Sequence, residues 1–170
     1  MVAATVHEAV LLEESMLILE LTPDGRYVDG TLGGGTHTRT ILERSSPNGC
    51  VLALDVDHTA LTRAEETFAV FGPRFRAVEK NFRFLDQAVS ETGFGPCDGV
   101  LLDLGFSSDE LLDPKKGLSF QQDGILDMRL GPQSNDDGLT AADIVNSWSK
   151  EEITTLLQEY GEERFAWKIA

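Results

Sequence analysis

The stretch Asp29-Gly30-Thr31-Leu32-Gly33-Gly34-Gly35-Thr36-His37-Thr38 is a glycine-rich turn between a short apolar run and a helical pattern. Glycines allow the backbone to approach a ligand closely, and the start of a helix offers free N–H groups. Asp55 follows about 20 residues after Gly35, at the tip of the next apolar run. An acid at that place accepts hydrogen bonds from both hydroxyls of a ribose. The stretch therefore predicts a site for a nucleoside-bearing cofactor.

Two cofactor classes share this layout, the nicotinamide dinucleotides and S-adenosylmethionine. Gly33 and Gly35 satisfy the first two glycines of the dinucleotide fingerprint, but its third glycine falls on Thr38. Asp29, directly before the glycines, favours the S-adenosylmethionine site of a methyltransferase. There we expect its carboxylate to contact the cationic methionine moiety of the cofactor. A simple tight turn remains the structural alternative for the glycines alone.

Around this stretch, short apolar runs alternate with amphipathic segments from residue 26 to residue 104. Such alternation is typical of βαβ units, and it predicts an α/β fold with a parallel sheet. The predicted strands are 26–29, 50–54, 75–79 and 98–104, in the sheet order 3-2-1-4. The predicted helices are 7–20, 36–44, 58–71 and 85–92. In the first of them, Val10, Leu11, Met16, Leu17 and Ile18 are expected on one apolar side.

The pattern changes after residue 104. Residues 105–138 carry Gly, Ser, Asp and Pro without sustained periodicity, which indicates a long functional loop or the entry to another domain. Helices are predicted at 140–148 and 151–160, with Thr140 and Ser149 as N-caps, and a third from 162 to 170.

Asp103 opens a second candidate site, Asp103-Leu104-Gly105-Phe106-Ser107-Ser108, after the fourth strand. Ligands of open α/β sheets bind at the carboxyl ends of the strands, beside the point where the strand order reverses. Strands one and four flank that point in the predicted order. Asp103 is therefore a candidate for orienting a substrate amine or the cofactor, with a structural acid that caps the next turn as the alternative.

Composition excludes several function classes. The 170 residues include 29 Asp and Glu against 14 Lys and Arg, a formal net charge of −15. No basic arm is present, so bulk charge does not attract nucleic acid. Cys50 and Cys97 lack the spacing of a thiolate zinc site, and no metal site is expected. No apolar run is long enough to span a membrane and no signal peptide is recognised, so we expect a cytoplasmic protein without a membrane partner.

The sequence resembles the bacterial 16S ribosomal RNA cytosine N4-methyltransferases, over almost the whole chain. Several of the shared motifs are not required by any generic nucleotide-binding fold. The shared motifs are His7-Glu8-Ala9-Val10-Leu11-Leu12, Asp29-Gly30-Thr31-Leu32-Gly33, Leu54-Asp55-Val56-Asp57, Asn81-Phe82, Asp98-Gly99-Val100-Leu101-Leu102-Asp103-Leu104-Gly105, Gly117-Leu118-Ser119-Phe120, Leu126-Asp127-Met128-Arg129 and Tyr160-Gly161-Glu162-Glu163-Arg164-Phe165-Ala166.

The resemblance implies a Rossmann-like, S-adenosylmethionine-dependent methyltransferase that methylates the exocyclic N4 of a cytosine in 16S ribosomal RNA of the small subunit. It implies a cofactor-binding core at 1–108, an incomplete parallel sheet, and the first loop and helices of an inserted substrate-recognition domain at 109–170. Asp103 is the implied catalytic residue. The implied cofactor-binding residues are Gly35, Thr36, His37, Asp55, Phe82, Asp103 and Glu110.

Three positions depart from the family pattern. Thr36 stands where the family usually has glycine, Glu110 replaces the usual glutamine, and Ile125 replaces proline. An ionised Glu110 accepts hydrogen bonds but does not donate them, unlike an amide. Family members are also longer, with the remaining strands of the sheet supplied after the inserted domain.

Several roles have two readings. For His37, a place beside the cofactor or at the start of a helix is favoured over a role as general base or metal ligand. Asp127 and Arg129 hold substrate or form an internal ion pair that organises the loop. Phe82 stacks on a base or packs in the core. RNA docking by so acidic a chain relies on a few basic residues or on sequence beyond this chain. The candidate bases are Arg83, Lys115, Lys116, Arg129, Arg164 and Lys168.

Two rival functions remain open at this point. One is a truncated, non-catalytic paralogue that only holds the cofactor, and the other is a methyltransferase that acts on DNA or on a small amine. Residues 100–104 form an apolar strand at the edge of the incomplete sheet, and unpaired apolar edges recruit partners or aggregate. We therefore expect the chain to self-associate through this edge or to be poorly stable, and to show little activity on small ribosomal subunits.

Overall fold

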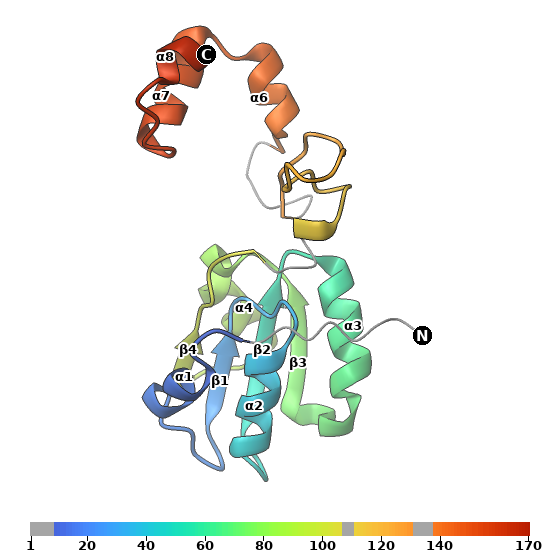
Figure 1. The fold of residues 1–170 in the computed structure, drawn as a ribbon. Coiled ribbons are helices and arrows are strands. Elements are labelled where there is room, and N and C mark those ends of the chain that lie inside the picture. Colours follow the sequence, from blue (N-terminus) through green and yellow to red (C-terminus); the bar gives the residue numbers. More distant parts are fainter. Residues whose placement is uncertain (1–8, 107–110, 131–137) are drawn as a thin grey trace. The chain divides into compact units, whose positions relative to one another are not determined.

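The computed structural model describes residues 9–106, 111–130 and 138–170. The chain forms two compact units, residues 1–109 and 110–170. The first unit contains a four-stranded parallel sheet in the order β3-β2-β1-β4 (Figure 1). The strands are β1 (Arg26–Asp29), β2 (Cys50–Asp55), β3 (Phe75–Glu79) and β4 (Gly99–Leu101). The predicted α/β class and strand order are confirmed.

Helices cover both faces of this sheet. They are α1 (Leu12–Ile18), α2 (Thr36–Arg44), α3 (His58–Phe68) and α4 (Leu85–Thr92), with 3₁₀ segments η1 (Ala69–Arg74) and η2 (Phe82–Phe84). Helices α2 and α3 lie on one face, and α4 lies on the other (Figure 1). This arrangement follows from right-handed crossovers between parallel strands. The helices stay on one face while the strand order runs from β1 to β3, and α4 lies on the other face because the chain then returns past β1 to β4.

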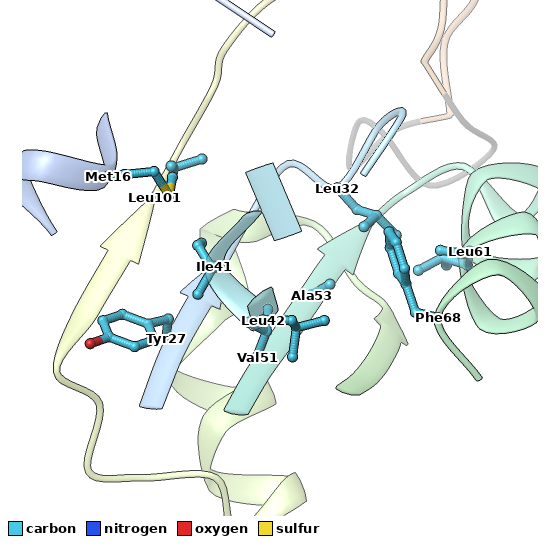
Figure 2. Close-up of a cluster of buried hydrophobic side chains, with 11 residues drawn as sticks. Met16, Tyr27, Leu32, Ile41, Leu42, Val51, Ala53, Leu61, Phe68 and Leu101 are labelled. Atoms are coloured by element: carbon cyan, nitrogen blue, oxygen red, sulfur yellow. The ribbon is translucent and has the colours of Figure 1, made fainter. Parts of the chain in front are cut away.

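The core forms two layers because strand side chains alternate between the faces. On one face, Tyr27, Val51 and Ala53 pack with residues of α1, α2 and α3, as Figure 2 shows. On the other face, Val28, Leu52 and Leu54 pack with Ala88 of α4 and with Phe94. The central strands are thus apolar on both sides, as expected for a parallel sheet, and this rigid support fixes the carboxyl ends of β1 and β2.

The fourth strand is shorter than predicted. It pairs with β1 only over Gly99–Leu101, because β1 itself ends at Asp29, the partner of Leu101. The side chains of Val100 and Leu102 are 47% and 46% exposed. Val100 pairs with the fully buried Val28, so it belongs to the α4 face of the sheet, which α4 covers only in part.

The first helix also differs from the prediction. It begins at Leu12 and ends at Ile18, between two residues with positive φ, Leu11 (51°) and Glu20 (47°). Of the five residues expected on its apolar side, only Met16 is buried. The other four, Val10, Leu11, Leu17 and Ile18, are exposed. The predicted apolar side is therefore wrong, because Leu12 and Leu19 pack on the core beside Met16 instead.

The second unit contains α6 (Ala141–Ser147), α7 (Lys150–Glu159) and α8 (Ala166–Ile169). Thr140 and Ser149 both form capping boxes, with Asp143 and Glu152 respectively, so the two predicted N-caps are confirmed. The third helix starts four residues later than predicted, after Glu162 with its positive φ of 50°. In the described parts of the chain, no helix combines the length and apolar character that crossing a membrane requires.

Arg129 forms an internal ion pair in the loop before α6. Its Nε and Nη2 donate to the two carboxylate oxygens of Asp127 at 2.7 and 2.8 Å, and its Nη1 donates to the carbonyl of Gly138. The guanidinium lowers the pKa of the Asp127 carboxyl, chiefly through these hydrogen bonds. Of the two readings of this pair, the structure shows the loop-organising one.

Candidate functional site

The glycine-rich turn is organised by Asp29, whose side chain is completely buried. One carboxylate oxygen accepts from the backbone N–H of Thr31 at 3.1 Å, and the other accepts from the hydroxyl of Thr38 at 2.7 Å. Burial raises the pKa of this carboxyl, although both hydrogen bonds act in the opposite direction. Asp29 therefore ties the loop to α2 from inside. The expectation that it meets a methionine end is corrected, because none of its surface is accessible.

Asp55 fastens the same loop to the end of β2. Its carboxylate accepts from the backbone N–H of Gly33 at 2.8 Å and from that of Asp57 at 2.9 Å. The side chain is partly buried, and desolvation raises its pKa despite these hydrogen bonds. A carboxylate oxygen has two lone pairs and can accept more than one hydrogen bond, so Asp55 keeps acceptor capacity for a ligand while it holds the loop.

Gly33 and Gly35 serve the loop in different ways, although both have positive φ, 47° and 78°. A Cβ at Gly35 would lie 2.7 Å from the ring of Phe68 in α3, whereas a Cβ at Gly33 would have no neighbour closer than 3.9 Å. Gly35 is buried. Its lack of a side chain therefore lets the loop pack on α3, and Gly33 is the glycine with open space beside it.

Asp103 lies two residues after β4 and reaches across to the loop after β1. Its backbone N–H donates to the hydroxyl of Thr31 at 2.7 Å. Its carboxylate Oδ2 is 3.7 Å from Nδ1 of His37, in the first turn of α2. The His37 side chain is 8% exposed and that of Asp103 is 40% exposed. The structure thus brings together His37 and Asp103, which are 66 residues apart in sequence (103 − 37).

Phe82 lies beside the start of this loop, in η2 after β3. A Cβ at Gly30 would be 3.2 Å from the Cβ of Phe82, so the two backbones are close neighbours. Phe82 is 40% exposed and is absent from the two buried apolar clusters of the first unit. An aromatic ring that is open to solvent beside the loop offers a stacking surface.

For the remaining predicted site residues, Thr36 and Glu110, the structure gives fewer contacts or none. Thr36 is the first residue of α2 and is partly buried, with its carbonyl accepting from the hydroxyl of Thr40. Glu110 lies outside the described residues. Across the described ranges, no group of three or more metal-ligating side chains is found.

Sequence reasoning did not single out Thr31 and Thr38, whose hydroxyls connect the loop to Asp103 and Asp29. Both lie within the quoted glycine-rich stretch. The partner of Thr31, Asp103, is known only once β4 lies beside β1, whereas Thr38 and its partner Asp29 are nine residues apart in the same stretch. A threonine directly after a strand-ending acid and glycine was the available signal, and it is a weak one.

The arrangement offers acceptors and an aromatic surface at the carboxyl ends of three adjacent strands. Asp55 is the last residue of β2, the glycine-rich loop follows β1, and Asp103 follows β4. Strand order reverses between β1 and β4, which is where open α/β sheets bind nucleotides. The carboxylates of Asp55 and Asp103 are suited to bind hydroxyl donors and a positive charge.

Known proteins resemble this chain in sequence. The ribosomal RNA small subunit methyltransferase H of Thermomicrobium roseum is 48% identical over 167 residues, which cover 98% of this chain and 50% of that protein. The chain therefore spans about half the length of this curated relative.

Two solved structures are more distant. An rRNA methylase from Streptococcus thermophilus is 22% identical, with a TM-score of 0.46, over 59% of this chain and 57% of that one. A protein from Clostridium thermocellum is 18% identical, with a TM-score of 0.46, over 61% of this chain and 57% of that one. The match to a family is far more extensive, since the MraW methylase family aligns with residues 4–170. The chain belongs to the MraW methylase family.

Proposed function

We propose that this chain carries the cofactor site of an S-adenosylmethionine-dependent methyltransferase that methylates the exocyclic N4 of a cytosine in 16S ribosomal RNA. The observation that carries this proposal is the meeting of Asp55, the glycine-rich loop and Asp103 at the carboxyl ends of β2, β1 and β4. The ribosomal RNA small subunit methyltransferase H of T. roseum, 48% identical, supports the substrate class.

The residues present fit S-adenosylmethionine. Asp55 has spare acceptor capacity at the end of β2 and would accept both ribose hydroxyls. The open space beside Gly33 would let the loop backbone approach the ligand, and the exposed ring of Phe82 would stack on adenine. Thr36, His37 and Gly35 complete the proposed set around the start of α2, with Gly35 acting through its packing on Phe68. Glu110 stays a proposed cofactor contact.

Catalysis is assigned mainly to positioning. When bound, S-adenosylmethionine supplies a methyl group activated by its sulfonium. The N4 amine of cytosine is a weak nucleophile because its lone pair is delocalised into the ring, so in-line placement is the main requirement. Asp103 is the proposed catalytic residue, since its partly exposed carboxylate would accept an N4 hydrogen and localise the lone pair. The target base has to leave its stack to reach this position, which costs little in a single-stranded loop.

The rRNA surface is proposed to use few basic side chains, because the chain carries a net charge of −15. Several of the six candidate bases have partners within the chain. Arg129 binds Asp127 and Gly138, and the Lys116 ammonium donates to the carbonyl of Leu130. Arg83 lies over the ring of Phe84 and Lys168 over the ring of Phe165, contacts that leave hydrogen-bond donors of both cations available. All six remain proposed RNA contacts: Arg83, Lys115, Lys116, Arg129, Arg164 and Lys168. A ribosomal substrate also places the proposed activity in the cytoplasm.

We also propose that the chain self-associates through the edge of β4. Within the described residues this strand pairs only with β1; the exposed Val100 lies in it, and the exposed Leu102 follows its last residue. Unpaired apolar edges recruit further polypeptide. A homo-oligomer through this edge would bury both side chains.

The deciding experiment offers labelled S-adenosylmethionine and this chain to small ribosomal subunits, to protein-free 16S RNA, to DNA and to a small amine. Label in N4-methylcytosine of 16S RNA supports the proposal. Cofactor binding without any transfer would favour the non-catalytic paralogue, and label in DNA or in the small amine would favour the other substrate classes. A variant with Asp103→Ala serves as the control for background transfer.

A further inference from the structure

We propose that His37 is a positioning residue whose ring Nδ1–H holds the Asp103 carboxylate beside the reacting amine. The inference rests on the proposed function and assigns the pair a role within that same site. It starts from two observations, the approach of the two side chains and the burial of the histidine ring.

The Asp103 carboxylate is fixed from two directions. Thr31 anchors its backbone, since the Asp103 N–H donates to the threonine hydroxyl at 2.7 Å. The His37 ring approaches its Oδ2 with Nδ1 at 3.7 Å. The ring itself is held in the first turn of α2, where His37 is only 7% exposed. A buried ring has few orientations open to it, so it restricts the position of the carboxylate that it faces.

The proton on the ring has one favourable place. A bare Nδ1 would point its lone pair at a carboxylate, which is repulsive, so Nδ1 carries hydrogen. The other ring nitrogen, Nε2, is buried and has no hydrogen-bond partner among the described residues. Among the described residues, the approach of Nδ1 to the Asp103 carboxylate is therefore the polar contact found for the two ring nitrogens. At 3.7 Å it is longer than a hydrogen bond, and catalytic contacts of this kind commonly shorten once substrate is bound.

The role in transfer follows from the proton balance. The N4 lone pair forms the new bond to the methyl carbon while the bond from that carbon to sulfur breaks, and its electron pair stays on sulfur. The amine nitrogen then carries one hydrogen too many and releases a proton. Asp103, 40% exposed, accepts this proton and passes it to water. His37 keeps the carboxylate aimed at the amine without taking the proton itself.

Two substitutions at His37 test which ring nitrogen matters. The amide nitrogen of asparagine occupies about the place of Nδ1, and that of glutamine about the place of Nε2. Both remove the buried ring, so they share its packing loss. We expect His37→Asn to retain kcat within a few-fold, and His37→Gln to lower kcat by about a hundredfold, the cost of misplacing a reacting group by roughly 1 Å. The KM for S-adenosylmethionine should change to the same extent in the two variants, because both remove the ring that belongs to the proposed cofactor set. Equal losses of kcat in the two variants would overturn the positioning role.

A spectroscopic measurement keeps the inference testable without turnover. The ¹⁵N signals of the His37 ring, assigned by their loss in His37→Asn, should show a hydrogen on Nδ1 and should shift in Asp103→Ala. The exposed His58, paired with Glu79 at 2.9 Å, should keep its signals in Asp103→Ala and is the internal control. A hydrogen on Nε2 alone would refute the pairing. If the pairing is seen but small subunits receive no methyl group, the proposed function fails and the contact stands.

Discussion

Replacing Gly35 by alanine should destabilise the first unit more than the same change at Gly33, two residues earlier in the loop. Both positions have positive φ, which costs an alanine about 1–2 kcal/mol. Only at Gly35 would the new methyl group meet a neighbour, the Phe68 ring at 2.7 Å, and overpacking of a core adds about 1–3 kcal/mol. We expect losses of about 1–2 kcal/mol for Gly33→Ala and about 2–5 kcal/mol for Gly35→Ala.

Urea unfolding followed by circular dichroism measures both losses. The double variant Gly35→Ala/Phe68→Leu supplies the coupling, because a smaller side chain at position 68 makes room for the methyl group. It should lose less stability than the sum of its two single variants. Equal losses for Gly33→Ala and Gly35→Ala, or strict additivity in the double variant, would refute the packing of this loop on α3.

Three further outcomes are expected. Burial raises the pKa of the Asp29 carboxyl, so the free energy of unfolding should fall as the pH rises from the ordinary aspartate range through the raised pKa. Thermal melts of Asp29→Asn over the same pH range should lack this fall. The same pH dependence in both proteins would contradict the prediction. Replacing the exposed Val100 with lysine should shift sedimentation of the chain towards the monomer, and an unchanged distribution would remove the β4 edge as the interface. Glu110→Gln should leave S-adenosylmethionine binding level or strengthen it at neutral pH, since the amide restores a donor; a substantial loss in calorimetry would mean that the carboxylate itself is used.

The sheet could be predicted from sequence because its central strands are short apolar runs between turns. The strand predicted at 50–54 is buried except at its first residue, and the structure extends it by one residue to Asp55. The strand predicted at 75–79 has the observed bounds of β3, although none of its residues is fully buried. The fourth strand was overextended because 98–104 is apolar beyond the point where β1 ends and pairing stops. The first helix was overextended because the positive φ at Leu11 and Glu20 has no signature in those residue types.

The site could be predicted in part. The loop and Asp55 were indicated by spacing, and the structure connects them through the hydrogen bond from Gly33. The burial of Asp29 was missed, because spacing shows where an acid follows a strand but not which way it faces. The approach of His37 to Asp103 depends on β4 lying beside β1, and no local pattern carries that information.

The central claim is that S-adenosylmethionine binds at the carboxyl ends of β1, β2 and β4, with Asp55 as acceptor for its ribose. Calorimetric titration of the chain with S-adenosylmethionine tests it most directly. Asp98 is a matched control, since it also accepts from a backbone N–H, that of Arg26, but at the opposite ends of the strands.

Hydrogen bonds to a charged group contribute about 1.5–3 kcal/mol, so Asp55→Ala should weaken binding roughly 10- to 150-fold. Asp98→Ala should leave the affinity within about twofold of the unsubstituted chain, because a change below 0.5 kcal/mol is expected away from the site. Unchanged affinity in Asp55→Ala, or equal losses in the two variants, would contradict the assignment of this edge of the sheet as the cofactor site.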